Sequence, residues 1–260
     1  MGEFSNKVVV VTGGSRGIGK AIAESFAREG AQTVLAASSQ ANLDKAAAAI
    51  GNTGPKPLTF AADLKSLEAC ERLHKFVQDK AGRCDVLINN AGATRGGNFL
   101  ELPDEAFHDG FALKYYACVR LSRLFWPMLK EREGHIVNII GGAARTPDAL
   151  FLIGGSVNSA IANFSKGLAG LGKKDGVNVN VIHPGMTETD RITTLLQQRA
   201  QASGMTPDEA RKEMLEKSGL RRIGQPEDVA ELALFLCSER ARHIQGAAIA
   251  VDGGQTSGLF

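Results

Sequence analysis

Short apolar runs alternate along the chain with longer stretches in which apolar residues recur every three or four positions. The first pattern is typical of buried strands and the second predicts helices. Seven strands are predicted, at residues 7–13, 32–38, 56–63, 84–92, 135–142, 177–185 and 247–254. Between the first six strands the pattern predicts helices at 17–30, 41–50, 66–82, 104–131 and 156–173.

The strand candidates are apolar almost throughout, as expected when helices cover both faces of a parallel sheet. Repeated strand–helix units with short connections predict a doubly wound, three-layer α/β fold. We find no internal repeat, low-complexity tract or linker, and therefore predict a single domain over residues 1–260.

One segment breaks this rhythm after the sixth strand. Residues 186–223 are polar and predict two helices, separated around Gly204 and Pro207. Ligands of open α/β sheets bind outside the carboxyl ends of the strands, where an insertion is well placed to act as a lid. A surface excursion without a role is the alternative.

Composition excludes several classes of protein. The net charge of +2 and the scattered Lys and Arg argue against nucleic-acid binding. Four widely separated cysteines and no His cluster argue against disulfides and against a metal site. We expect a cytoplasmic protein, since no apolar run is long enough for a membrane span and the N-terminal residues lack the apolar core of a signal peptide.

A glycine-rich turn, TGGSRGIG at 12–19, follows the first predicted strand and opens directly into a helix. Gly13 allows a tight turn off the strand, and the missing side chains of Gly17 and Gly19 let backbone approach a pyrophosphate. Backbone N–H groups at the helix N-terminus then face the anion. This context makes the turn a candidate dinucleotide site.

The T-G-x-x-x-G-x-G form of this turn resembles that of the short-chain dehydrogenase/reductase family. Further motifs occur in the order which that family shows: Asp63 after the third strand, NNAG at 89–92, PGMTET at 184–189 and DGG at 252–254. The resemblance covers nearly the whole chain. It implies a Rossmann-type, seven-stranded parallel sheet and an NAD(P)-dependent oxidoreductase.

By this resemblance, cofactor-binding residues extend over the motifs and their neighbours. They are Gly13, Ser15, Arg16, Gly17, Ile18, Gly19, Ser38, Asp63, Leu64, Asn90, Ala91, Gly92, Pro184, Gly185, Thr187 and Thr189.

The second strand ends without the carboxylate that accepts the ribose hydroxyls of NAD. Ser38 stands near that end, and Arg16 offers a guanidinium to a 2′-phosphate. We therefore favour NADP(H) over NAD(H). A solvated Arg16 is the alternative.

The family's catalytic residues are replaced in this chain. In the family, a tyrosine exchanges the proton, a lysine four residues later lowers the tyrosine pKa, a serine polarises the substrate oxygen and an asparagine completes a water relay. Ungapped counting from VNVIHPG places Gly154, Asn158, Gly141 and Lys114 at these four positions, in that order. Tyr115 and Tyr116, the two tyrosines of the chain, lie on another predicted helix.

Lysine and asparagine have thereby exchanged positions. We hypothesise that Lys114 and Asn158 face each other and hydrogen-bond to the cofactor ribose or the substrate, with Ser156 or Tyr115 as a substitute proton relay. In the alternative interpretation, Lys114 points to solvent and the two tyrosines pack at a subunit interface.

Three functions remain open at this point. We favour a divergent NAD(P)(H)-dependent oxidoreductase acting on a small or medium carbonyl or hydroxyl compound, with a remodelled acid–base set. A catalytically inactive nucleotide-binding sensor or partner subunit is the alternative, and a lyase or isomerase with a structural nucleotide is the third.

The resemblance also implies a homotetramer or homodimer. The family pairs through the two long helices, here 104–131 and 156–173, and then through the last strand. Apolar residues on these helices are expected to be buried beyond one chain: Leu121, Phe125, Trp126, Leu168 and Leu171.

Overall fold

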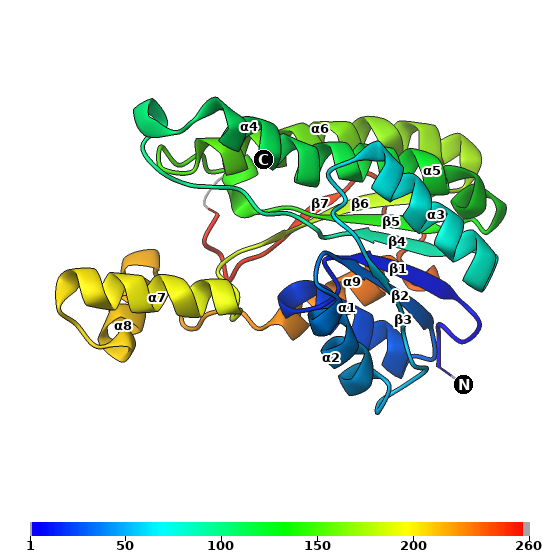
Figure 1. Cartoon of the computed structure of the whole chain (residues 1–260), viewed down its shortest axis with the longest axis horizontal. Helices are drawn as coiled ribbons and strands as arrows, with labels where there is room; N and C mark the ends of the chain where they lie inside the picture. Colours follow the sequence, from blue (N-terminus) through cyan, green and yellow to red (C-terminus); the bar gives the residue numbers. More distant parts are fainter. Residues whose placement is uncertain (1, 257–260) are drawn as a thin grey trace.

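The computed structural model describes residues 2–256, which form a three-layer α/β fold (Figure 1). Its strands are β1 (Val8–Thr12), β2 (Gln32–Ala37), β3 (Leu58–Ala61), β4 (Val86–Asn89), β5 (His135–Ile139), β6 (Asn178–Pro184) and β7 (Ala248–Val251). Within the described residues they form one seven-stranded sheet in the order β3-β2-β1-β4-β5-β6-β7, with every neighbouring pair parallel. The predicted fold class is confirmed.

Helices cover both faces of this sheet. One layer holds α1 (Gly17–Arg28), α2 (Gln40–Ile50) and α9 (Pro226–Leu236), and the other holds α3 (Leu67–Ala81), α5 (Ala117–Glu131) and α6 (Leu152–Asp175). Each layer has its own apolar core against the sheet, represented by Phe26 on one face and Phe125 on the other. The near-continuous apolar strands follow from this double coverage.

Helix α9 is missing from our sequence-based prediction. Pro226 occupies its first turn, and Gln225 and Asp228 form a reciprocal capping box around it. Proline at the helix start followed by an acid is a recognisable signal. The polar insertion before it interrupts the strand–helix alternation on which our helix predictions rest.

The single helix predicted at 104–131 is wrong in detail. The segment divides into α4 (Asp104–Gly110), the π-helix η2 (Phe111–Tyr116) and α5. A π-turn shifts the side chains that follow it around the helix axis and is frequent at functional sites. Lys114 and Tyr115 both lie in this π-helix.

The predicted insertion contains α7 (Asp190–Ser203) and α8 (Pro207–Ser218), and Figure 1 shows both standing apart from the three layers. Gly204 ends α7 with a φ of 66°. Thr206 then caps α8, accepting a hydrogen bond from the backbone N–H of Glu209. The two helix breaks fall where glycine and proline predict them.

Two of the residues expected to be buried at a subunit interface are already buried within the single chain. Leu121 and Phe125 are buried in the core between α5 and the sheet, so they leave nothing for a partner to cover. Leu171 stays 47% exposed and Tyr116 49% exposed. Helical periodicity alone does not distinguish a face packed on the sheet from one packed on another subunit.

The four cysteines are free and buried, as the composition predicts. The described part of the chain contains no helix that is both long and apolar enough to cross a membrane.

Candidate active site

The glycine turn has the shape that a dinucleotide requires. Gly13 and Gly17 adopt positive φ angles of 66° and 52°, which side-chain-bearing residues rarely adopt. A Cβ on Gly19 would stand 2.3 Å from the carbonyl oxygen of Gly13, so any larger residue would push the turn off the helix. Helix α1 begins at Gly17, shortly after the carboxyl end of β1, and the first N–H groups of a helix have no partner within it. These features fit a bound pyrophosphate.

The NNAG motif holds this turn in place. The side-chain amide of Asn90 donates to the carbonyl oxygens of Thr12 and Gly13, at 3.1 and 3.3 Å. The Thr12 hydroxyl in turn accepts from the backbone N–H groups of Asn90 and Ala91, at 3.0 and 2.9 Å. The ends of β1 and β4 are thus joined at the point where the strand order reverses, which is where open α/β sheets bind ligands.

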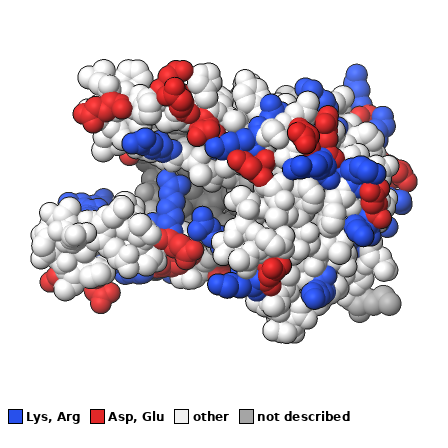
Figure 2. Space-filling view, in the orientation of Figure 1, with Lys and Arg blue, Asp and Glu red and all other residues white. Residues whose placement is uncertain are grey.

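A cavity of about 810 Å³ lies beside this turn at the carboxyl ends of the strands. It is lined from the glycine turn, from β5 and the loop after it, from the segment after β6 and from α7. Six of the predicted cofactor residues are among its lining, together with Lys114: Ile18, Asn90, Pro184, Gly185, Thr187 and Thr189. Figure 2 shows the molecule hollowed between the insertion and the layers, with basic side chains along the hollow.

Lys114 lines this cavity and contacts the buried Asn158. Nζ of Lys114 donates a hydrogen bond of 2.6 Å to Oδ1 of Asn158, although the residues come from η2 and α6. The lysine stem passes over Gly92, where a Cβ would stand 2.8 Å from Cδ of Lys114. The absence of a side chain at Gly92 therefore leaves room for the lysine stem.

The surroundings of Lys114 lower its pKa. Burial, and then the positive charge of Arg191, lower the pKa of Lys114 to about 8. Both effects disfavour the ammonium form. A lysine with such a pKa exchanges protons near neutral pH, which an ordinary lysine does far less readily.

Asn158 is fully buried, and its Nδ2 has no hydrogen-bond partner among the described residues. This amide points toward Gly141, where an added Cβ would lie 3.0 Å from Nδ2. A buried donor without a partner is costly, so the position suits an acceptor atom that a ligand brings. Gly141, at the family's serine position, leaves the room for it.

The position of the family's tyrosine is filled by another aromatic ring. A Cβ on Gly154 would stand 2.0 Å from Cε1 of Phe151, so the phenylalanine ring occupies the space of the missing side chain. The Arg191 guanidinium lies over the same ring, 5.4 Å from its centroid. Nothing in the sequence indicated Phe151, because its ring folds back from the residue preceding α6.

Ser156 and Tyr115 do not join this arrangement. Ser156 is exposed on α6, and neither residue lines the cavity. The Tyr115 ring packs against Phe111, Tyr116 and Phe164. Neither hydroxyl has a path to the lysine among the contacts of the described residues.

The predicted adenosine end is open to solvent. Ser38 is exposed after β2, with no acid beside it, and the next residue, Ser39, caps α2. Asp63 is exposed and accepts a hydrogen bond from the backbone N–H of Lys65, while Leu64 is buried. Arg16 approaches Asp190 of α7 at 3.7 Å, with 71% of its side chain exposed.

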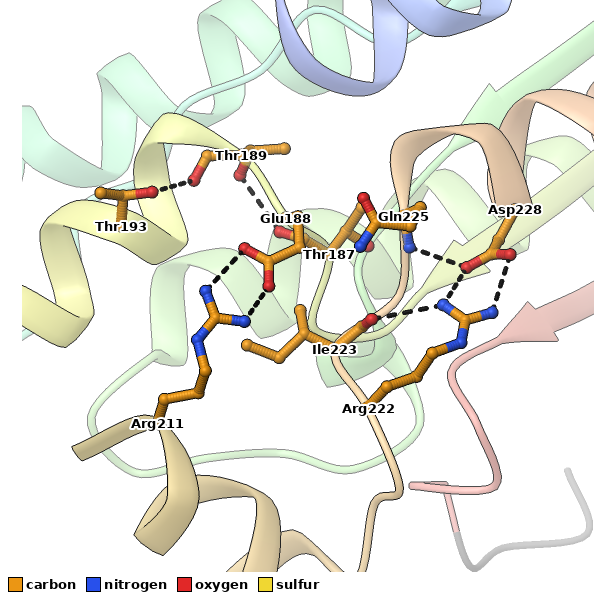
Figure 3. A network of polar contacts seen from close by, with 9 residues as sticks. All are labelled: Thr187, Glu188, Thr189, Thr193, Arg211, Arg222, Ile223, Gln225 and Asp228. Carbon is orange, nitrogen blue, oxygen red and sulfur yellow. Dashed lines mark hydrogen bonds and ion pairs between the residues drawn. The ribbon is translucent and has the colours of Figure 1, made fainter. Parts of the chain in front are cut away.

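A polar network joins the two chain segments at the base of the insertion (Figure 3). The backbone N–H of Glu188 donates to the Gly224 carbonyl oxygen at 2.8 Å, so the entering and leaving segments lie side by side. The Glu188 carboxylate accepts hydrogen bonds from both terminal nitrogens of Arg211 on α8. This network holds Thr187 and Thr189 at the cavity.

The family model for enoyl-(acyl carrier protein) reductase matches residues 13–256. The chain belongs to the short-chain dehydrogenase/reductase family. It is 32% identical to the 7alpha-hydroxysteroid dehydrogenase of Bacteroides fragilis over 262 residues, covering 98% of this chain and 96% of the relative. It is 31% identical to the 3-oxoacyl-(acyl carrier protein) reductase FabG of Vibrio cholerae, with 97% and 98% covered.

Among solved structures, L-sorbose reductase from Gluconobacter frateurii, complexed with NADPH and L-sorbose, superposes with a TM-score of 0.95 at 34% identity. The match covers 100% of this chain and 99% of that one. These findings make the protein an NAD(P)-dependent oxidoreductase of the short-chain family.

Proposed function

We propose that this short-chain family member uses NADP(H) to interconvert a small or medium carbonyl compound and its alcohol, with Lys114 in place of the family's tyrosine. One observation carries the proposal: the Lys114 amine lies at the cavity, fixed by Asn158 and with its pKa lowered to about 8. The enzyme thus keeps a proton donor at the site after losing the phenol.

In the reducing direction, a nicotinamide held by the segment after β6, with Thr187 and Thr189, would supply the hydride that the carbonyl carbon receives. The Lys114 ammonium gives its proton to the carbonyl oxygen as the C=O π bond breaks, which yields the alcohol and a neutral amine. Asn158 Oδ1 orients the ammonium, and the unpartnered Nδ2 donates to the substrate oxygen or to a water beside it. Solvent protons restore the ammonium, and oxidation follows the same steps in reverse.

The preference for NADP(H) is supported by the adenosine end of the site. No carboxylate follows β2, and Arg16 lies on the glycine turn with most of its side chain exposed. A 2′-phosphate would find a guanidinium there and no like charge at the strand end. The structural relative complexed with NADPH is consistent with this preference.

The proposal extends to the role of the insertion, to the oligomeric state and to the cellular compartment. Helices α7 and α8 act as a lid over the cavity, because α7 contributes Arg191 and Ile192 to its lining. The exposed Leu171 and Tyr116 support a homotetramer or homodimer through α5 and α6. The four free cysteines favour the cytoplasm.

Cofactor binding and turnover test the proposal together. NADPH fluorescence should show binding, and NADPH oxidation should follow with members of a panel of ketoses, 3-oxoesters and hydroxysteroids. NADPH binding without turnover of any carbonyl or alcohol would instead favour a nucleotide-binding sensor or inactive partner subunit.

A further inference from the structure

Arg191 is a second cation at the cavity, and the proposed chemistry does not use it. It lies in the first turn of α7 and lines the cavity together with Lys114. Its guanidinium lies over the Phe151 ring, 5.4 Å from the centroid, and this contact leaves its N–H groups for a ligand.

Among the arginines of helices α7 and α8, Arg191 differs from the other two in its pairing. Arg199 pairs with Glu213 at 3.3 Å, and Arg211 pairs with Glu188. Arg191 has no ion pair within residues 2–256, although two carboxylates also line the cavity. Those carboxylates are engaged by backbone: Asp148 accepts from Leu150 N–H at 2.8 Å, and Asp252 accepts from Gly254 and Thr256 at 3.0 and 2.9 Å.

The two cations also oppose each other. The charge of Arg191 contributes to lowering the pKa of Lys114, so two positive charges lie at one cavity, and neither is paired with a carboxylate among the described residues. An anion bound at Arg191 would offset this repulsion and favour the ammonium form that carbonyl reduction requires. The positive charges of the site would then be balanced only when the anionic ligand is bound.

From this geometry we infer that the substrate carries an anionic group, a carboxylate or a phosphate, which Arg191 binds while Lys114 serves the carbonyl oxygen. The inference rests on the proposed function and names its substrate class. A planar guanidinium matches both anions through paired N–H donors. Arg191 belongs to the insertion, so the anion would also draw α7 toward the cavity.

Matched pairs of carbonyl compounds test the inference. Acetoacetate is compared with methyl acetoacetate, and fructose 6-phosphate with fructose, which distinguishes the carboxylate from the phosphate. Calorimetry on the protein saturated with NADP⁺ measures binding without turnover, and NADPH oxidation measures kcat/KM. We expect the anionic member of at least one pair to bind about 10- to 100-fold more tightly, as a charge-assisted contact implies.

Variants assign this preference to one residue. Arg191→Gln should lower kcat/KM and affinity far more for the anionic member of a pair than for the neutral one, which removes most of the preference, and Arg191→Lys should restore part of it. Arg199→Gln, on the same helix and outside the cavity lining, is the matched control and should change neither. The parent's NADPH affinity should survive in Arg191→Gln.

Three results overturn the inference: no anion preference in the parent, an equal loss for both members of a pair in Arg191→Gln, or a loss confined to NADPH binding. Anion binding without turnover would support the inference and count against the proposed redox function. Turnover of the neutral members alone would support the proposed redox function and contradict the inference of an anionic substrate.

Discussion

Nζ of Lys114 lies 2.6 Å from Oδ1 of Asn158, and this contact reverses the arrangement of lysine and asparagine that the family's pattern implies. The ammonium stays at the cavity but comes from the π-helix η2, and the amide comes from α6. By our motif counting, the exchange keeps the two chemical groups while glycines stand at the tyrosine and serine positions. We propose that the four substitutions together form one remodelled site.

Lys114→Met tests the proton donor. Removing a positioned general acid should lower kcat about 10²- to 10⁴-fold, while the glycine turn continues to bind NADPH. Steady-state kinetics and NADPH fluorescence measure the two effects. Lys173→Gln, an exposed lysine on α6, is the control. A Lys114→Met enzyme as active as the parent would contradict the proposed role.

The pH profile reports the same lysine. Reduction requires the ammonium, so kcat/KM for reduction should be level at lower pH and fall above a pH of about 8. Oxidation requires the neutral amine and should rise through the same range. Asn158→Asp places a carboxylate on the ammonium, which raises the pKa of Lys114 and should shift both profiles about 1 to 3 units toward alkaline pH. Parent and variant profiles that coincide would exclude Lys114 as the titrating group.

Phe151 and Gly154 are predicted to be coupled. Gly154→Tyr alone places Cβ against the Phe151 ring and should be destabilising by about 1–3 kcal/mol, whereas Phe151→Ala opens the space. The double variant should therefore be more stable than the sum of the single changes predicts. Thermal unfolding of all four proteins measures the coupling. Strict additivity would mean that the ring does not occupy the tyrosine's space.

The fold and the nucleotide site could be predicted because their signals are local. Apolar runs mark the strands, and the glycines at 13, 17 and 19 are required by backbone geometry that only glycine satisfies easily. Counting against the family's pattern also led to the hypothesis that Lys114 faces Asn158, and the structure shows this contact. The same periodicity that placed the helices did not reveal the π-helix, because one extra residue per turn leaves no compositional mark.

The catalytic details required three-dimensional packing. The place of the Phe151 ring depends on the chain direction before α6, and Arg191 reaches the cavity only because the insertion folds back beside it. Arg191 could have been suspected as a basic residue just after the nicotinamide loop. Tyr115 was a candidate proton relay because it carries a phenol, but its ring packs among other aromatic rings.

Arg16 is predicted to select the cofactor. Arg16→Gln should raise the Kd for NADPH about 10-fold or more and change that for NADH less than about 3-fold, since only NADPH carries the 2′-phosphate. Asp190→Asn removes the carboxylate that Arg16 approaches at 3.7 Å and should tighten NADPH binding slightly. Arg28→Gln, at the other end of α1, is the control. Equal losses for both cofactors would argue against a phosphate contact.

The pairing of Glu188 with Arg211 is predicted to hold the insertion in place over the cavity. Both side chains are partly exposed, so Glu188→Gln should change global stability by less than about 1 kcal/mol. Local opening should respond more strongly, because the pair joins the base of the insertion to α8 (Figure 3). Hydrogen exchange should quicken in α7 and α8, and KM for the carbonyl substrate should rise as the lid opens.

The matched control for this change is Glu216→Gln on α8. The Glu216 carboxylate is exposed and forms a weak pair with Lys212, at a distance of 4.0 Å. This variant removes the same charge from the same insertion without touching its base. Faster exchange in both variants would attribute the effect to the lost charge. Faster exchange only in Glu188→Gln, together with a raised KM, would assign it to the contact that holds the insertion, and Arg191 with it, beside Lys114.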